Sequence, residues 1–133
     1  MVNLHITDTS IVERIAFFQS LAQSHPTAFT SAEVHDAIPT YFSRHSDELA
    51  ALKVERRPGR PASTREDALK QLQAQEENEF LSGFWMPDLE DEKNVETLKS
   101  WGGHWISLGT MKFVRVNKEG GRRGSVWPPK GNS

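Results

Sequence analysis

Residues 29–42, FTSAEVHDAIPTYF, contain both the start signal and the apolar face of the helix that organises this chain. Thr30 and Glu33 form a capping box, in which each side chain accepts a hydrogen bond from the other residue's backbone N–H. Phe29 and Val34 flank this box at the spacing of a hydrophobic staple. The stretch therefore predicts a helix that starts after Thr30 and buries one face.

The apolar face continues at helical spacing beyond this stretch, through Leu49 and Leu52. Pro39 lies inside the run, and a proline lacks a backbone N–H and clashes with the preceding turn. We therefore expect a short helix to about residue 37, a kink or break, and a longer helix to about residue 56.

Capping boxes also mark a helix on each side of this region. Ser10 and Glu13 open the upstream helix, which ends before a His-Pro pair. Its apolar residues share one face: Ile11, Ile15, Phe18 and Ala22. Ser63 and Glu66 open the downstream helix, which we expect over residues 64–82 with a glycine as its C-cap.

The remaining segments are less regular. We expect an apolar turn over residues 84–89, a short helix over 91–101 and a strand or extended arm over 111–116. The predicted fold is mainly α, a small helical domain of about four to five helices with an irregular C-terminal arm. Its parts are an N-terminal lead (1–9), the helical domain with its extended C-terminal segment (10–116) and a flexible basic tail (117–133).

The composition excludes several classes of protein. The chain has 133 residues, which suits one domain, and it lacks cysteine, so disulfides, thiolate zinc sites and cysteine nucleophiles are ruled out. No apolar run approaches the roughly 18 residues that suggest a membrane span. Residues 1–5, MVNLH, have neither the basic nor the apolar part of a secretory signal, so we expect an intracellular soluble protein.

Charge is distributed unevenly along the chain, although the net charge is only −2. Residues 53–70 hold six basic and three acidic residues, and residues 111–133 hold six basic and one acidic. Between them, residues 76–98 hold eight acidic residues and one basic residue. A strongly acidic stretch thus separates two basic ones, and each basic stretch is a candidate for contact with a polyanion.

The two basic stretches combine arginines, which match phosphate geometry, with glycines and an aromatic residue, which suit RNA. The predicted RNA-binding residues are Lys53, Arg56, Arg57, Arg60, Arg65, Lys112, Arg115, Lys118, Arg122 and Arg123. Both stretches would also fit solvent-exposed connections that bind nothing.

The acidic helix cannot favour RNA, so it should face protein or solvent. Trp127 lies in a polar tail without apolar neighbours, which suggests an exposed partner contact, whereas the other tryptophans should lie in the core. The predicted protein-binding residues are Glu76, Glu77, Glu79 and Trp127.

No constellation in the sequence supports catalysis or metal binding. It has no phosphate-binding loop and no dinucleotide fingerprint, and its five histidines lack metal-ligand spacing. We therefore expect no enzyme activity, no metal and no cofactor.

Short motifs follow one another in a particular order from residue 11 to residue 116. They are Phe17-Phe18-Gln19, Phe29-Thr30, Tyr41-Phe42, Gly59-Arg60-Pro61, Ser63-Thr64-Arg65-Glu66, Gly83-Phe84, Met86-Pro87-Asp88-Leu89, Trp101 and Met111-Lys112-Phe113. This ordered set resembles the translation machinery-associated protein 16 family, whose members are assembly factors of the large ribosomal subunit.

The resemblance implies a nuclear and nucleolar, mainly helical, non-enzymatic ribosome biogenesis factor. Its partners would be precursor large (60S) ribosomal subunits, contacted through ribosomal RNA and ribosomal proteins, with no membrane and with a monomeric state off the particle. It also implies a strongly basic segment ahead of the first helix, which residues 1–9 do not contain.

Two other hypotheses stay open. One is a helix-turn-helix-like DNA-binding regulator, although Arg44 is the only residue of base-reading type between residues 31 and 52. The other is an adaptor that binds only proteins through its acidic helix.

Overall fold

The structure is a computed structural model, and it describes residues 8–55, 59, 61, 63–125 and 127. Its α-helices are α1 (Asp8–Gln23), α2 (Ser31–Phe42), α3 (Ser46–Glu55), α4 (Thr64–Ser82) and α5 (Glu92–Lys99). Two short 3-10 helices are η1 (Ser43–His45) and η2 (Ile106–Thr110), and the strands are β1 (Phe84–Pro87), β2 (Phe113–Val116) and β3 (Arg122–Ser125). The predicted mainly α fold is confirmed, and a small antiparallel sheet is added to it.

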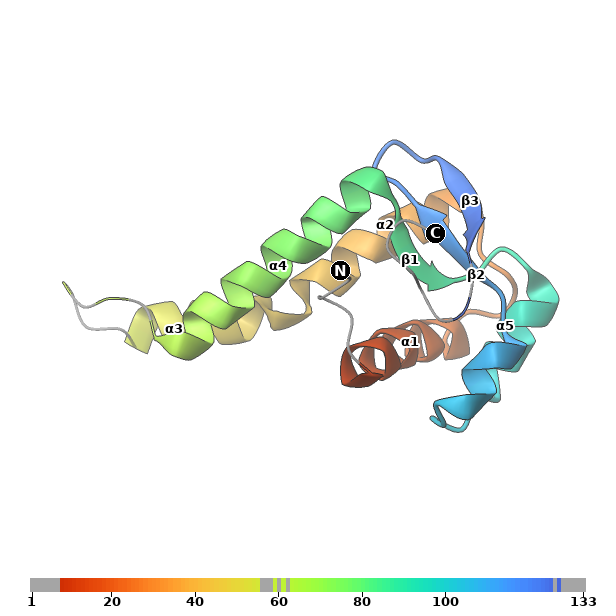
Figure 1. Ribbon diagram of the computed structural model, residues 1–133, viewed down its shortest axis with the longest axis horizontal. Helices are drawn as coiled ribbons and strands as arrows, with labels where there is room; N and C mark the ends of the chain where they lie inside the picture. Colours follow the sequence, from red (N-terminus) through yellow and green to blue (C-terminus); the bar gives the residue numbers. More distant parts are fainter. Residues whose placement is uncertain (1–7, 56–58, 60, 62, 126, 128–133) are drawn as a thin grey trace.

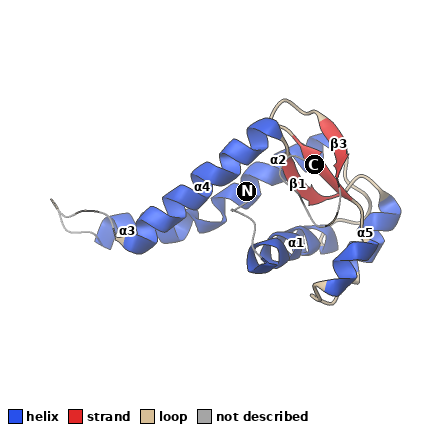
Figure 2. Cartoon of the chain, viewed as in Figure 1, coloured by secondary structure: helices blue, strands red, loops and turns tan. Residues whose placement is uncertain are grey.

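A long helical hairpin dominates the shape of the molecule. α2, η1 and α3 follow one another alongside α4, and the outer part of this pair extends away from the rest of the chain (Figure 1). α1, α5 and the sheet form a base at the other end (Figure 2). The end of α3 and the start of α4 therefore form the outer end of the hairpin.

The predicted capping signals set the start of two helices. The Thr30 hydroxyl accepts a hydrogen bond from the backbone N–H of Glu33 (3.2 Å), and the Glu33 carboxylate accepts one from the N–H of Thr30 (2.9 Å). Ser63 caps α4 by accepting from the N–H of Glu66 (3.1 Å). These bonds satisfy N–H groups that have no partner inside the helix.

The predicted break near Pro39 is wrong, because α2 continues through Pro39 to Phe42. Pro39 is exposed, so its ring displaces no core side chain, and its missing N–H removes a single bond of the helix. Ile38 and Tyr41 are both buried and anchor the helix next to it. The irregularity falls later, at η1, where the helix tightens before α3 begins.

Aromatic rings fill the core where α1, α2 and β1 meet. The ring of Phe18 stacks on that of Tyr41 with 5.7 Å between centroids, and Phe42 meets Phe84 edge to face at 5.4 Å. Such pairs add about 0.5–1.5 kcal/mol each beyond the area they bury. By contrast α3 has no buried residue, so the outer part of the hairpin stands outside this core.

The strands pair in the order β1-β2-β3, and both pairings are antiparallel. The predicted turn over residues 84–89 is wrong where β1 forms, and the strand predicted within residues 111–116 is confirmed by β2. The flexible tail predicted from residue 117 is wrong where β3 forms. β3 reads RRGS and forms by backbone pairing with β2, which a pattern of side chains does not reveal.

Asn94 ties α5 to the segment that leads into β2. Its Nδ2 donates to Asp88 O (2.9 Å) and Lys112 O (3.0 Å), and its Oδ1 accepts from Lys112 N (2.7 Å). Asp91 caps α5 by accepting from the N–H of Asn94 (3.0 Å). The buried Asn94 amide therefore pairs with the backbone of Lys112 much as a strand residue would.

Among the described residues, no helix combines the length and the apolar character that crossing a bilayer requires.

Candidate functional site

The predicted RNA-binding residues fall at the two ends of the molecule. Lys53 lies in the last turn of α3 and Arg65 in the first turn of α4, at the outer end of the hairpin. The others of this set that are described lie on or beside strands β2 and β3, at the far end of the molecule (Figure 1). Three of the predicted residues lie outside the described part of the chain, in the sequence that connects α3 to α4: Arg56, Arg57 and Arg60.

At the outer end of the hairpin, Lys53 is exposed and has no side-chain partner among the described residues. Arg65 makes a two-pronged contact with Glu48, with Nε–Oε2 at 2.7 Å and Nη2–Oε1 at 3.0 Å. This hydrogen bonding raises the pKa of Arg65 and lowers the pKa of Glu48. Since the pair is exposed, it is weak and Arg65 can exchange its partner for a phosphate.

Arg115 is not a surface cation, so its predicted RNA contact is wrong. Its residue is only 4% exposed, its Nη1 donates to Gly83 O (3.0 Å), and it lies 3.8 Å from the Glu79 carboxylate. Burial lowers the pKa of Arg115 below its usual value despite the attraction of Glu79. Gly83 makes room for this side chain, because a Cβ there would come within 3.1 Å of the Arg115 Cβ.

Two further predicted cations are paired with carboxylates from the acidic stretch. Arg122 contacts Asp88 (Nη2–Oδ2, 2.7 Å) and Glu90 (Nε–Oε2, 3.2 Å), and the hydrogen bond with Asp88 raises the pKa of Arg122. Lys112 contacts Asp91 (Nζ–Oδ2, 3.0 Å). Lys118 and Arg123 differ, because both are exposed and neither side chain pairs with a carboxylate in the described part of the chain.

The acidic helix α4 turns two of its carboxylates inward. Glu79 accepts both Nη groups of Arg14 (3.0 and 3.1 Å) as well as the backbone N–H of Trp85 (2.8 Å). Glu76 accepts both Nη groups of Arg44 (2.9 and 2.8 Å). The predicted partner-facing role is therefore wrong for these two carboxylates.

One signal in the sequence could have predicted the buried ion pair between Arg14 and Glu79. Arg14 lies three residues after Ile11 and four before Phe18, so it sits within the apolar face of α1. A cation on a buried face requires a buried partner. Burial alone would lower the pKa of Arg14, but the charge and hydrogen bonds of Glu79 raise it above its usual value. Glu77, by contrast, stays exposed as predicted.

Trp127 packs against the sheet and η2, so the expectation that it lacks apolar neighbours is wrong, while its contact with a partner stays a prediction. Its ring lies 4.8 Å from Trp105, 5.8 Å from Phe113 and 6.0 Å from Trp85, measured between centroids. Trp85 is fully buried and Trp101 is 7% exposed, which confirms their core placement, whereas Trp105 is half-buried. Trp127 therefore covers the aromatic side of the sheet.

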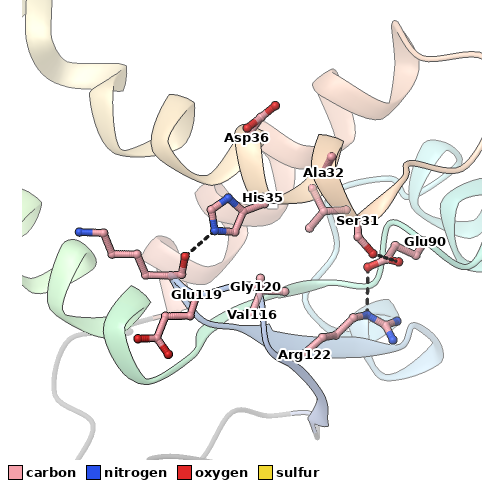
Figure 3. Close-up of a pocket in the computed structure, with 11 residues that line it drawn as sticks. Ser31, Ala32, His35, Asp36, Glu90, Val116, Glu119, Gly120 and Arg122 are labelled. Carbon is pink, nitrogen blue, oxygen red and sulfur yellow. Dashed lines mark hydrogen bonds and ion pairs between the residues drawn. The ribbon is translucent and has the colours of Figure 1, made fainter.

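An open groove of about 370 Å³ separates the first turns of α2 from the β2–β3 hairpin (Figure 3). Ser31 Oγ donates to Glu90 Oε1 (2.8 Å), and Arg122 reaches the same carboxylate from the other side. His35 Nε2 lies 2.6 Å from Lys118 O, so this nitrogen carries the proton, because a carbonyl only accepts. The groove is built from segments that are distant in sequence, so no short sequence motif predicts it.

The geometry bears on the alternative hypotheses. The described residues contain no group of three or more His, Cys, Asp or Glu that could hold a metal ion. α2 and α3 run nearly end to end through η1 rather than crossing at a turn (Figure 1), so they do not form a helix-turn-helix pair.

The fold and these surfaces define a small helical scaffold that presents exposed cations from a protruding hairpin and from a sheet. Residues 3–118 match the family model of translation machinery-associated protein 16, and the chain belongs to this family. It is 37% identical over 111 residues to the translation machinery-associated protein 16 of Saccharomyces cerevisiae, covering 80% of this chain and 62% of that protein.

More distant relatives carry the same name. The Danio rerio protein is 24% identical over 113 residues, covering 81% of this chain and 58% of its own length. The Mus musculus protein is 25% identical over 111 residues, covering 80% of this chain and 50% of its own length. The chain thus spans between half and two thirds of the length of these curated relatives.

Proposed function

We propose that this chain is a non-enzymatic ribosome biogenesis factor that associates with precursor large (60S) ribosomal subunits. It would act in the nucleus and nucleolus and contact both ribosomal RNA and ribosomal proteins. Family membership supports an association with the translation machinery, as the name of the yeast relative states for that protein. The observation that carries the RNA contact is the placement of exposed, unpaired cations at the two ends of an elongated molecule (Figure 1).

Each end suits a different part of an RNA surface. The hairpin projects from the base, so Lys53 at its outer end would reach between RNA helices. The connecting sequence adds three further arginines to the charge available for RNA. Lys118 and Arg123 lie on the other end and would hold a second stretch of backbone. Phosphate contacts at two separated points fix the orientation of a protein on its RNA without requiring base recognition.

Ribosomal proteins are commonly basic, so the remaining exposed carboxylates suit them as partners. Those exposed on α4 and α5 are Asp67, Glu77, Glu92 and Glu96. Because Glu76 and Glu79 are paired inside the molecule, this acidic surface is smaller than the sequence suggests.

Charge reversal tests the proposal directly. Arg57→Glu combined with Arg60→Glu, and separately Lys118→Glu, should reduce co-sedimentation with purified precursor large subunits by about tenfold or more. Lys93→Glu on the exposed face of α5 is the matched control and should bind as the wild type does. If all variants sediment equally with the precursor subunits, the proposed RNA contact is refuted, provided that their melting temperatures agree.

Salt dependence gives a second measurement. Three phosphate contacts, from Lys53, Lys118 and Arg123, predict that affinity for RNA falls by about 20- to 40-fold between 50 and 200 mM salt. Six contacts, with the three arginines of the connecting sequence added, predict a fall of about a thousandfold. A flat salt dependence would favour an adaptor that binds only proteins.

A further inference from the structure

The outer edge of β1 is closed by side chains. The backbone N–H of Trp85 donates to Glu79 Oε2 (2.8 Å), and Arg14 Nη1 donates to Trp85 O (2.9 Å). Pro87 is the next residue of β1 whose backbone faces outward, and a proline has no N–H to donate. An exposed sheet edge is a template for another strand, and β1 is protected against such pairing.

The register shows which groups of β3 point outward. In an antiparallel sheet both backbone groups of a residue point to the same side, and successive residues alternate. The backbone N–H and C=O of Trp85 point away from β2. Those of its partner Arg115 therefore point away from β1, toward Arg123 of β3. Arg122 and Gly124 therefore direct their N–H and C=O groups away from the sheet.

The outer edge of β3 lacks the protection that β1 has. Within the described part of the chain, the outward backbone groups of Arg122 and Gly124 meet no hydrogen-bond partner, and both residues are exposed. A Cβ added to Gly124 would meet no atom within 4 Å, so the space around it is open. The edge offers two donors and two acceptors at the spacing that an added strand requires.

The surroundings of this edge indicate the side chains of an occupant. One face of an added strand would lie toward the groove beside α2, whose floor includes the buried Val34 and Val116 (Figure 3). The other face would lie toward Arg123, which is exposed and has no carboxylate partner among the described residues. Short apolar side chains suit the first face, and carboxylates suit the second.

We propose that the outer edge of β3 is a docking site for an extended, acidic segment of a partner protein, which adds to the sheet as a fourth strand. Backbone hydrogen bonds to Arg122 and Gly124 provide the attachment. The groove and Arg123 select the side chains that alternate along the segment. This site shares Arg123 with the proposed RNA contact, but its attachment uses the outward backbone groups of β3, which the RNA proposal does not use.

Amide hydrogen exchange followed by NMR tests the docking site on the full chain. The probe is a short synthetic peptide, blocked at both ends, in which glutamate alternates with valine, and its lysine counterpart is the control. In the protein alone, the amides of Arg122 and Gly124 should exchange freely while those of Arg123 and Ser125 are protected by β2. The glutamate peptide at saturation should slow the exchange of Arg122 and Gly124 by about tenfold or more, and the lysine peptide should not.

Two variants of one residue separate the backbone bond from other effects. Gly124→Pro deletes the outward N–H without removing a bond to β2, and it should weaken binding of the glutamate peptide by about tenfold. Gly124→Ala keeps that N–H and places its Cβ in open space, so it should bind within about twofold of the wild type. If Gly124→Pro fails to fold, Arg123→Glu provides the test, because it should reverse the preference between the two peptides.

Several results would overturn the docking site. One is unchanged exchange of Gly124 with the glutamate peptide, and another is equal binding by the proline and alanine variants. Protection of the same amides by an RNA oligonucleotide but not by the peptide would make the edge a nucleic-acid surface. Protection that rises with protein concentration alone would show that a second copy of the chain occupies it.

Discussion

Glu79 is the most informative residue to change, because it balances a buried guanidinium. The Arg14 side chain is only 6% exposed and Glu79 only 17%, and Glu79 is the carboxylate that Arg14 contacts. Removing one partner of such a buried pair costs about 3–5 kcal/mol, because the other charge stays buried without compensation. Glu79→Gln keeps an acceptor for the N–H of Trp85, so we expect the lower end, about 3 kcal/mol. For a chain of this length that corresponds to a fall in melting temperature of about 10–15 °C.

The measurement is urea unfolding followed by circular dichroism, with Glu77→Gln as the matched control. Glu77 is exposed two residues earlier on the same helix, so its free energy of unfolding should change by less than about 0.5 kcal/mol. Replacing both partners, as Arg14→Met with Glu79→Leu, should recover part of the lost stability, because the buried charge of Arg14 is removed while the buried Arg115 still loses the Glu79 carboxylate. If Glu79→Gln unfolds at the same urea concentration as Glu77→Gln, the assignment of a buried ion pair is refuted.

Three further predictions concern the stability of the fold. Asn94→Leu should lower the free energy of unfolding by about 2–4 kcal/mol, because backbone groups at the start of β2 lose their partners, and a shift below 0.5 kcal/mol in urea unfolding would contradict this. Thr30→Ala should cost about 1 kcal/mol through loss of the cap of α2, and an unchanged melting temperature would contradict this. Hydrogen bonding to Glu33 raises the pKa of His25, so the contribution of His25 is present below its unfolded pKa of about 6.5 and is lost as the pH rises through the higher folded value. Melting temperatures of wild type and His25→Gln should therefore converge at alkaline pH, and a constant difference between pH 5.5 and 9 would exclude this linkage.

Local sequence signals predicted the helices well where the signal itself is local. The capping box at Thr30 forms in full, Ser63 caps α4 through its hydroxyl alone, and α4 spans the predicted residues 64–82. The helix start predicted at Ser10 is wrong, because α1 already begins at Asp8. Pro39 misled the prediction, because the rule against proline in a helix counts a lost bond but not the buried neighbours that offset it. The cost of one missing bond at an exposed position is smaller than the gain from burying the residues on either side.

The sheet was only partly predictable, for a physical reason. β2 contains alternating apolar residues, whereas β3 consists of Arg122, Arg123, Gly124 and Ser125 and has no apolar pattern. Its formation depends on backbone groups of β2 that are distant in sequence, and on the turn that Asn117 stabilises by accepting from the N–H groups of Glu119 and Gly121. A pattern of side chains carries no information about such long-range backbone pairing.

The charge blocks of the sequence overstate the charge of the folded surface. Most carboxylates of residues 76–98 pair with cations from other parts of the chain: Glu76, Glu79, Asp88, Glu90 and Asp91. Their partners come from the second basic stretch and from α1 and η1: Arg14, Arg44, Lys112, Arg115 and Arg122. Folding therefore neutralises the blocks against each other, and the described cations left without a carboxylate at the predicted site are Lys53, Lys118 and Arg123. Because the described cations that remain lie at opposite ends, the proposed RNA contact would engage both ends at once, which a large folded RNA can do.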